Sequence, residues 1–567
     1  MSDGARGATA TRSGTAPLPP EMPPYSGREK IITMLGVLLA MFLSSLDSTI
    51  VGTAMPRIIA DLQGFDRYAW VSSAYLLTST VTVPIYGKLS DQLGRKSIFI
   101  LGVILFLIGS ALSGTAQTMN ELIAYRAFQG IGAGSLMSLA PAIVGDIFTP
   151  RERGKWQGVT GAVFGISSII GPLIGGWLTE YASWHWVFYV NIPIGIIALL
   201  VLIFVMPALH RGTGQATIDY TGSILIVVGV VPLLLALSLG GAPYPWLSPQ
   251  IAGLLIVAIL ALTGFVIYEA RLSARGGQPV LEPRLFKNSI FTVSTIITMT
   301  TTMALYGSIF FIPLFLQGVA GQSATNSGLV MTPLLLASVV TSIVSGQLVS
   351  RLGRYKWLAI TGIVISIIGQ FVLVRLNINS TGGEVVLGMI VLGLGLGFSM
   401  SLYTLIVQNA LPTRIGEATG ALVFFRSIGG ALALGLMGSL LNSAYLPAFR
   451  RALPASVTHA VPGKMLSVFD NPQILLSPDM MSKVQAQFAA QGAQGQAIFQ
   501  RIIEAVKVGL VQGIHEGFIM SFVLMLMSLV AVFFLPEIAL RGPARGRPAS
   551  TAARDAEPVE SNAGAPL

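Results

Sequence analysis

Asp47 and Arg126 are charged residues inside long apolar stretches, where their types suit proton binding and ion pairing. A carboxyl group in apolar surroundings can take up and release a proton near neutral pH. An unpaired arginine at membrane depth is costly, so Arg126 should face a partner or water. We therefore expect a proton or cation site at Asp47. Two simpler interpretations stay open: Asp47 bonded near the outer interface to Ser44, Ser48 or Thr49, and Arg126 in a purely structural salt bridge.

Four more charged or titratable residues are candidates of the same kind. Arg426 lies in a glycine-rich apolar stretch and could supply a second charge to a central cavity. Glu417 should lie nearer the inner surface. His515 and Glu516 fall at the outer end of the last apolar stretch, where we interpret them as interfacial residues rather than as a proton relay.

The segment Gly87–Lys96 is a charged turn with glycines at both ends, between two apolar stretches. Fixed charges so close to hydrocarbon are costly unless they lie at the membrane surface. The pattern returns at Gly346–Arg354, with glycines, leucines and an arginine in the same register. Only the first copy carries an acid, Asp91, where the second has Ser350. A turn repeated in this way indicates a transporter built by duplication.

The first copy of the turn is predicted to be a gating latch. Asp91 could cap or face a helix end, while the basic residues stay at the membrane surface. An acid near the end of the fourth apolar stretch, Asp146, and a basic residue just after it, Arg153, are the expected partners on the same side of the membrane. A topogenic role would require only the basic residues, and it is the alternative. The residues assigned to the latch are Gly87, Asp91, Gly94, Arg95, Asp146 and Arg153.

Gly171 and Pro172 interrupt the fifth apolar stretch. Proline removes a helix hydrogen bond and clashes with the preceding turn, so a kink is expected here. Neighbouring glycines allow another helix to approach closely, and ordinary small-residue packing is the simpler interpretation. We assign both residues a conformational role.

The composition sets the class of protein that must position these residues. Hydrophobic residues make up 53% of the 567 residues and charged residues only 10%, whereas a soluble protein carries about 25% charged residues. We expect an all-α polytopic membrane protein, because a lone strand cannot span lipid. Fourteen stretches reach the length of roughly 20 residues that a span requires. They are 31–54, 68–88, 97–117, 121–147, 156–180, 186–207, 218–240, 250–270, 289–316, 325–349, 357–376, 384–409, 416–445 and 513–535.

The distribution of lysine and arginine predicts that both chain ends lie in the cytoplasm. The net charge of +10 is then a topological bias and implies no nucleic-acid partner. Eight spans separate the two charged turns, where a plain duplication would place six, so two spans are inserted. The predicted organisation is a cytoplasmic tail 1–30, a six-helix bundle 31–207, two inserted helices with linkers 208–288, a six-helix bundle 289–540 that includes an outer segment 446–512, and a cytoplasmic tail 541–567.

Four further motifs accompany the charged turn. They are Leu46–Val51 with Ala54–Pro56, Arg126–Gly134, Gly161 and Gly165 with Gly171–Gly176, and Trp184–Phe188 with Asn191–Gly195. The turn resembles the signature loop of the major facilitator superfamily. Together the motifs resemble those of its fourteen-span drug:proton antiporters, and the resemblance covers about residues 30–540.

This resemblance implies the major facilitator fold with fourteen helices, arranged as six plus two plus six. It also implies proton coupling through Asp47 and Arg126, and it associates the motif around Gly171 and Pro172 with exporters. The expected function is proton-coupled secondary export of small hydrophobic or amphipathic compounds, and thus multidrug efflux by alternating access. Such a transporter of the plasma membrane uses protons and a small-molecule substrate, needs no cofactor or metal, and is not an enzyme.

Other functions stay open at this point. Movement of a lipid or a specific metabolite is the second transport hypothesis, and a membrane sensor or membrane-embedded enzyme is less favoured. The chain has no cysteine and only 4 histidines, which argues against a metal site. The outer segment 446–512 is interpreted as an outward extension of the last span or as a helix on the outer leaflet. It could guide lipid or bind a partner, but a plain spacer is the favoured interpretation.

Overall fold

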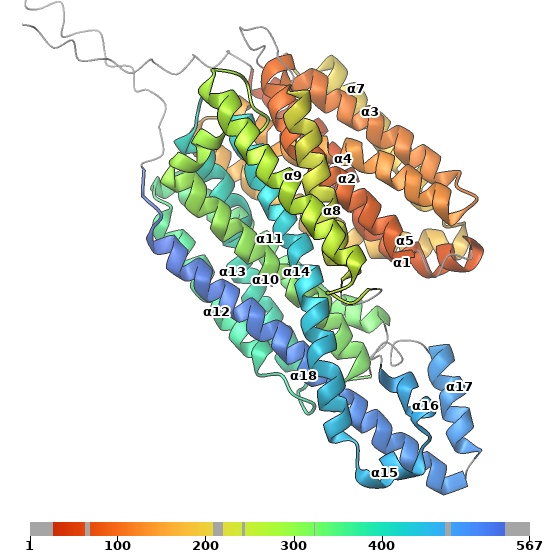
Figure 1. The fold of residues 1–567 in the computed structure, drawn as a ribbon. Helices are drawn as coiled ribbons and strands as arrows, with labels where there is room; N and C mark the ends of the chain where they lie inside the picture. The colour runs from red at the N-terminus through yellow and green to blue at the C-terminus, as the bar shows by residue number, and fades with distance from the viewer. Residues whose placement is uncertain are drawn as a thin grey trace, which may run out of the picture.

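The computed structural model describes residues 26–62, 68–207, 219–240, 244–321, 324–470, 478–490 and 492–538. Within these residues the fold is helical, apart from an isolated bridge between Gly240 and Tyr244 (Figure 1). The helices are α1 Gly27–Leu62, α2 Tyr68–Leu93, α3 Arg95–Gly114, α4 Met119–Ile147, α5 Pro150–Tyr181, α6 Trp186–Tyr189, α7 Asn191–Phe204, α8 Tyr220–Leu239, α9 Pro249–Ala274, η1 Pro283–Lys287, α10 Ser289–Gly318, α11 Ala324–Leu352, α12 Lys356–Val374, α13 Gly382–Ala410, α14 Ile415–Ala452, α15 Ala455–Ala460, α16 Gly463–Leu466, η2 Ser467–Asp470, α17 Pro478–Ala489 and α18 Gly492–Phe533.

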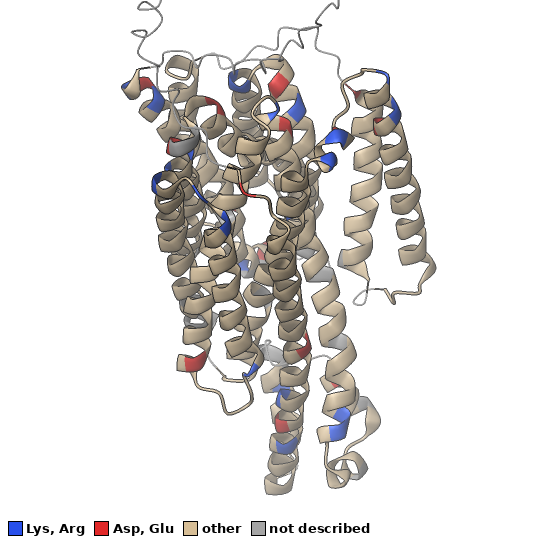
Figure 2. Cartoon of the chain, turned by 90° about the vertical axis from the view of Figure 1, so that its left-hand side faces the viewer, with Lys and Arg blue, Asp and Glu red and all other residues tan. Residues whose placement is uncertain are grey.

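In the described part of the chain, 13 helices are long and apolar enough to cross a membrane. The helix α2, with 26 residues, is one more long helix packed among them. Every predicted span falls on one of these helices. Charged residues gather toward the helix ends and are sparse in the middle of the helices (Figure 2). The prediction of an all-α polytopic membrane protein is confirmed.

Local sequence sets where some helices begin. The hydroxyl of Ser26 accepts the N–H of Glu29 at 3.2 Å, and the Glu29 carboxylate accepts the N–H of Ser26 at 2.9 Å. This reciprocal capping box starts α1 directly after Ser26, so the helix begins before the predicted span 31–54. Thr149 and Glu152 form the same motif at the start of α5. The predicted tail 1–30 is therefore helical in its last residues, and its remainder lies outside the described residues, as do 208–218 and 541–567.

The helices form two bundles with an extra pair packed beside them. The first bundle contains α1 to α7, and the second contains α10 to α14 with α18 (Figure 1). The helices α8 and α9 pack on each other and touch the bundles mainly through α8, which contacts α14 and α2. This is the predicted arrangement of six, two and six spans.

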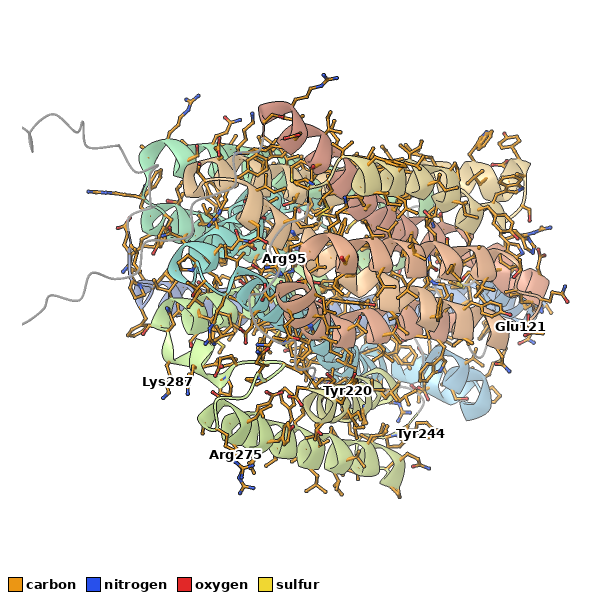
Figure 3. The ribbon with its side chains drawn as sticks, turned by 90° about the horizontal axis from the view of Figure 1, so that it is seen from above. Arg95, Glu121, Tyr220, Tyr244, Arg275 and Lys287 are labelled. Atoms are coloured by element: carbon orange, nitrogen blue, oxygen red, sulfur yellow. The ribbon has the colours of Figure 1, made fainter. Side chains whose placement is uncertain are left out.

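The two bundles contact each other mainly through α5 with α11 and through α2 with α14. These contacts lie toward the end of the molecule where Arg95 lies, which we call the Arg95 end. Figure 3 shows Arg275 and Lys287 toward this end and Glu121 and Tyr244 toward the other end, which we call the opposite end. Substantial contact between α1 and α10 is absent from the described residues. Within the described residues, the main contacts between the bundles therefore lie toward the Arg95 end.

The segment predicted as 446–512 projects at the opposite end (Figure 1). The helix α14 continues to Ala452 and α18 already begins at Gly492, so both run past the predicted spans 416–445 and 513–535. The first interpretation of this segment, an outward extension of the last span, therefore describes α18. Residues 471–477 and 491 of the segment lie outside the described residues.

Apolar packing explains why these extensions stay helical beyond the spans. The hydroxyl of Tyr445 donates to the carbonyl of Phe469 at 2.6 Å. A side chain at Gly509 would lie 3.0 Å from Phe449, so α14 and α18 approach closely here. Apolar residues at helical spacing on α18 are buried against this surface. They are Phe499, Ile502, Val506 and Leu510.

Candidate functional site

Asp47 of α1 and Arg126 of α4 form an ion pair inside the first bundle. Asp47 Oδ2 lies 2.5 Å from Arg126 Nη1, and the two residues are 0% and 1% exposed. Arg126 therefore faces an acidic partner. Ser48 and Thr49 donate to backbone carbonyls of α1 instead, so the interpretation that local hydroxyls hold Asp47 is wrong. The partner lies on another helix, which no local pattern could indicate.

Two amide side chains complete the network around the carboxylate. Gln129 Nε2 and Asn191 Nδ2 donate to Asp47 Oδ1 at 2.9 and 3.0 Å. Gln129 Oε1 also accepts from Arg126 Nη1 at 2.8 Å. The carboxylate thus joins α1 to α4 and α7. A proton placed on Asp47 would break the ion pair and weaken the attachment of α1 to both helices.

Aromatic rings cover the guanidinium group. Arg126 Cζ lies 4.2 Å from the ring centre of Tyr75 and 5.8 Å from that of Phe188. Such cation–π contacts contribute about 0.5–2 kcal/mol. Tyr75 is held by a 3.0 Å hydrogen bond to Ser44. Sequence reasoning assigned no site role to Tyr75, Phe188, Gln129 or Asn191, although the last three lie in the motifs described above. Gln129 had a further signal, because it follows Arg126 by three positions and shares its helix face.

The charged turn joins α2 to the start of α14 at the Arg95 end. Asp91 Oδ2 accepts the backbone N–H of Glu417, in the first turn of α14, at 2.9 Å. The free N–H groups of a helix start favour an anion. Arg95 pairs with Asp91 and, through Nε at 2.6 Å, with Asp146 at the end of α4. Asp91 therefore faces a helix end, and that helix belongs to the other bundle.

Both copies of the turn end on glycine in the left-handed region. Gly94 has φ of 94° and Gly353 has φ of 68°. Residues with a side chain are strained in this conformation, so glycine sets the turn in each copy. The second copy lacks the carboxylate: Ser350 packs beside Gly154, where a Cβ would lie 3.5 Å from Ser350 Cβ.

Pairs of glycines let the bundles approach each other closely. A Cβ on Gly87 would lie 3.1 Å from the carbonyl oxygen of Gly416. A Cβ on Gly154 would lie 2.5 Å from the carbonyl oxygen of Gly346. The first pair joins α2 to α14 and the second joins α5 to α11. The two contacts have the same form, as expected if the two bundles arose by duplication.

The linker between α9 and α10 braces the same end. Glu282 Oε2 lies 3.1 Å from Arg414 Nη1, and the backbone N–H of Glu282 donates to Glu417 Oε1 at 3.0 Å. Gln92, in the charged turn, donates to Gln278 Oε1 at 2.6 Å. The linker therefore contacts both the turn of the first bundle and the start of α14 in the second.

The environment of Glu282 favours its charged form. Burial raises the pKa of this carboxyl group, but hydrogen bonds from Ser273, from the backbone N–H of Arg284 and from Arg414 together outweigh burial. The resulting pKa lies below the ordinary value of 4.5. The Ser273 hydroxyl donates to Glu282 Oε1 at 2.5 Å. The Glu282 carboxyl group is therefore ionised at neutral pH.

Arg153 and the group of Gly171 and Pro172 make contacts other than the ion pairs of the latch. Arg153 is buried and donates from Nε to the carbonyl of Phe148 at 2.9 Å; it forms no ion pair within the described residues. Its charge also interacts with that of Asp146, so the role of Arg153 in the latch stays a prediction. Gly171 packs against Thr49 of α1, and α5 continues through Gly171 and Pro172 without a break. The side chain of Pro172 lies outside the described ones.

The remaining candidates are dispersed along the second bundle. Arg426 lies within α14, half-buried with Tyr306 nearby, and it has no acidic partner among the described side chains. His515 and Glu516 are half-buried on α18, where Gln512 donates to Glu516 at 3.1 Å. The structure does not bring these three residues to the Asp47 network.

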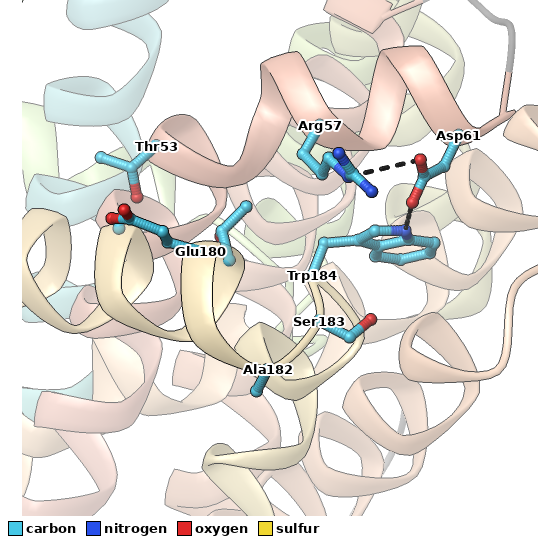
Figure 4. Close-up of a pocket in the computed structure, with 9 residues that line it drawn as sticks. Thr53, Arg57, Asp61, Glu180, Ala182, Ser183 and Trp184 are labelled. Atoms are coloured by element: carbon cyan, nitrogen blue, oxygen red, sulfur yellow. Dashed lines mark hydrogen bonds and ion pairs between the residues drawn. The ribbon is translucent and has the colours of Figure 1, made fainter.

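A cavity of about 500 Å³ opens at the opposite end, between α1 and α5 (Figure 4). Asp61 accepts a hydrogen bond from Trp184 Nε1 at 3.0 Å and lies 3.4 Å from Arg57 Nε. Glu180 also lines the cavity. Next to the cavity, burial of the imidazole lowers the pKa of His185, whereas the charge of Asp61 raises it by a smaller amount. Sequence reasoning assigned no site here.

Known proteins resemble the chain over most of its length. Residues 37–434 match a family profile described as Major Facilitator Superfamily. The multidrug transporter protein MdtP of Bacillus subtilis (strain 168) is 38% identical over 526 residues, which cover 90% of this chain and 94% of that protein. Multidrug resistance protein 3 of the same bacterium is 36% identical over 516 residues, covering 90% and 95%.

Solved structures share the fold at low sequence identity. The crystal structure of the human organic anion transporter MFSD10 matches with a TM-score of 0.55 and 14% identity, covering 88% of this chain and 99% of that one. The proton:xylose symporter XylE matches with a TM-score of 0.55 and 13% identity, covering 91% and 98%. At these identities the likeness concerns the fold alone.

Proposed function

Because this chain belongs to the major facilitator superfamily, we propose that it exports small hydrophobic or amphipathic compounds in exchange for protons. Two relatives that cover 90% of the chain carry the names of multidrug transport and multidrug resistance proteins. The observation that carries the proton part is the buried pair of Asp47 and Arg126, the one ion pair inside the first bundle in the described residues that is almost fully enclosed.

The proton acts at Asp47. In the charged form its carboxylate accepts hydrogen bonds from Arg126, Gln129 and Asn191 and so holds α1 against α4 and α7. Protonation removes the charge that attracts Arg126 and frees α1 to move. Proton entry supplies the energy for export, because each proton that moves down the membrane potential releases about 2.3 kcal/mol per 100 mV. Substrate leaves in the opposite direction as the two bundles rock between two arrangements.

The latch keeps one end closed while the other is open. We place the Arg95 end in the cytoplasm, together with both chain termini, because basic residues concentrate in the loops of that side. The structure then represents the outward-facing arrangement in the plasma membrane. To turn inward, the transporter must release Asp91 from α14 and separate the glycine contacts of α2 and α5 from the other bundle. Arg426 of α14 supplies a further charge to the space between the bundles.

Purified protein in proteoliposomes tests this function. With an imposed pH gradient, addition of ethidium or another amphipathic compound should evoke proton flux, detected with a pH-sensitive dye. Among the described residues, the Glu121 carboxylate at the opposite end of α4 accepts a bond from the local backbone N–H of Gln117, so Glu121→Gln serves as the control. The absence of substrate-evoked flux across a broad panel would refute antiport. Flux that appears only with a fluorescent phospholipid would favour the lipid-transport hypothesis instead.

A further inference from the structure

Two carboxylates face each other at the Arg95 end of the inserted helix pair. Asp219 directly precedes α8, and Glu269 lies in the last two turns of α9. Gly222 marks their meeting point: a Cβ on this glycine would touch both Asp219 Oδ2 and Glu269 Oε1. The absence of a side chain at Gly222 therefore leaves room for the two acids to approach. Figure 3 shows this helix pair, with Tyr220 and Arg275 labelled, at the edge of the molecule.

Neither acid is satisfied as an ionised group. Glu269 is only 1% exposed, and both of its carboxylate oxygens lack a hydrogen-bond partner, as does Asp219 Oδ2. The other oxygen, Asp219 Oδ1, accepts the N–H of Gly222 at 2.8 Å and caps α8. The backbone N–H groups of Val280 and Leu281 lie near Glu269 without completing well-formed hydrogen bonds. A buried carboxylate in this state is costly.

Basic groups on the neighbouring elements are engaged elsewhere. Arg271 and Arg275 of the same helix end are exposed to solvent. On α14, Arg414 pairs with Glu282 and lies 4.0 Å from Glu417. On α2, Lys88 faces Glu417. In the described part of the chain, the titratable group that faces Glu269 is thus Asp219, and no cation neutralises the pair.

We propose that Asp219 and Glu269 form a proton-binding site in which one proton is shared between the two carboxylates. The proton comes from the adjacent aqueous phase, binds one carboxylate oxygen and donates a hydrogen bond to the other acid. This single proton removes one charge and supplies a donor to the carboxylate oxygens that have none, those of Glu269 and Asp219 Oδ2. The nearby N–H groups of Val280 and Leu281 favour an anionic or neutral acid over a metal cation, because they point positive charge at the site.

The site is separate from the proposed transport proton. Asp47 lies inside the first bundle, whereas Asp219 and Glu269 lie on the inserted pair. Val280 and Leu281 directly precede Glu282, through which the linker braces the start of α14. A proton bound to Glu269 thus acts on the linker next to the latch. The inserted helices thereby provide the transporter with a second group that responds to pH at this end.

Infrared difference spectroscopy of the full-length purified protein tests the site directly. A pH step should reveal the carbonyl stretch of a protonated carboxylic acid. Glu269→Gln should abolish the band assigned to the pair. Asp219→Asn keeps the helix cap, because asparagine caps as well as aspartate does. In that variant we expect a protonated Glu269 whose titration midpoint differs from that of the parent by about one pH unit or more.

Control variants separate a shared proton from an unrelated acid and from a bound metal cation. Glu384→Gln, which changes an exposed acid at the start of α13, should leave the band unchanged. A band that persists in Glu269→Gln, or a midpoint that stays the same in Asp219→Asn, would overturn the proposal. The proposal would also be overturned if both carboxylates stayed ionised at every pH measured and the spectrum responded to added sodium or potassium instead. Because two variants are compared, failure of one of them to fold leaves the other as a test, and transport is not needed for the readout.

Discussion

At the scale of single residues, the buried ion pair of Asp47 and Arg126 concentrates the chemistry of the first bundle. Two charges removed from water remain stable only when geometry and further hydrogen bonds compensate the loss of hydration. Gln129 and Asn191 provide those bonds, and Tyr75 covers the guanidinium group. Removal of one charge leaves the other buried alone. The same pair can therefore stabilise one arrangement and, once protonated, release it.

Asp47→Asn should abolish substrate-evoked proton flux, because asparagine cannot carry the proton. It should also lower the unfolding temperature, since an unpaired buried Arg126 costs about 3–5 kcal/mol. The double variant Asp47→Asn with Arg126→Gln should recover much of that stability without recovering coupling. Dye-based flux and thermal unfolding of the purified variants measure both effects. Full coupled flux in Asp47→Asn would refute the role given to this residue.

At the scale of elements, the charged turn and the glycine contacts act together. The positive φ of Gly94 and Gly353 fixes the two turns, and the glycines on α2, α5, α11 and α14 let the bundles touch backbone to backbone. Only the first turn adds a carboxylate at a helix start. The two copies thus share their shape and differ in the charge that can hold them closed.

Asp91→Asn should impair transport more than Ser350→Ala does. Asp91 accepts the N–H of Glu417 and pairs with Arg95, whereas Ser350 only packs beside Gly154. A hydrogen bond to a charged group contributes about 1.5–3 kcal/mol, and a loss near 1.4 kcal/mol shifts the gate equilibrium about tenfold. Initial rates of ethidium efflux in cells that produce equal amounts of each variant measure the difference. Comparable rates in the two variants would contradict this asymmetry.

Gly154→Val should prevent the bundles from closing at the Arg95 end. Its Cβ would lie 2.5 Å from the carbonyl oxygen of Gly346, so α5 and α11 must separate. Gly253→Val, on α9, is the matched control, because a Cβ there meets no atom within 4 Å. We expect at least a tenfold loss of efflux in the first variant and less than a twofold change in the second. Equal activity of the two would show that this glycine contact is dispensable.

The ion pair between Glu282 of the linker and Arg414 should weaken in acid. Since the pKa of Glu282 is lowered by folding, its contribution to stability is present above the ordinary value of 4.5 and disappears as the pH falls through the lower folded value. The contribution is at most about 1 kcal/mol, because the Arg414 side chain is 41% exposed. The unfolding temperature of the parent should exceed that of Glu282→Gln at pH 7, and the gap should narrow as the pH falls below 4.5. A gap that widens in acid would contradict the sign of this shift.

At the scale of the whole molecule, the bundles are joined at the Arg95 end and separate at the opposite end. The latch, the glycine contacts and the linker all lie at the joined end. The long extensions of α14 and α18 lie at the opposite end, where they pack on each other through their own apolar surface. Closure at one end and separation at the other is the geometry that alternating access requires.

Spin labels at the two ends should report opposite movements. Labels at the exposed residues Leu93 and Leu352 lie in different bundles at the Arg95 end, and labels at Arg57 and Arg375 lie in different bundles at the opposite end. When the protein turns inward with ethidium bound, the first distance should lengthen and the second should shorten. Pulsed electron resonance in nanodiscs at several pH values measures both. Distances that change in the same direction would contradict the rocking movement.

Much of the fold could be predicted from local patterns, whereas the partners in the site could not. Apolar length located every long helix, and glycine spacing located both turns. The predicted start of α1 is late because the capping box of Ser26 and Glu29 lies in a polar stretch. The bond of Arg153 to the carbonyl of Phe148 could not be predicted, because the direction of its side chain depends on the loop before α5. The acid pair of Asp219 and Glu269 had no local signal, since its members belong to two different helices.

The sequence by itself determined that this chain crosses a membrane many times, that it contains two related bundles with an inserted pair, and that its turns carry charge. These properties depend on composition and spacing within a stretch of chain. The tertiary structure decided which charges meet: Asp47 with Arg126, 79 positions away, and Asp91 with the N–H of Glu417, 326 positions away. Such partners depend on how each helix is rotated and where it packs. Those quantities are set by contacts among all the helices rather than by any one segment.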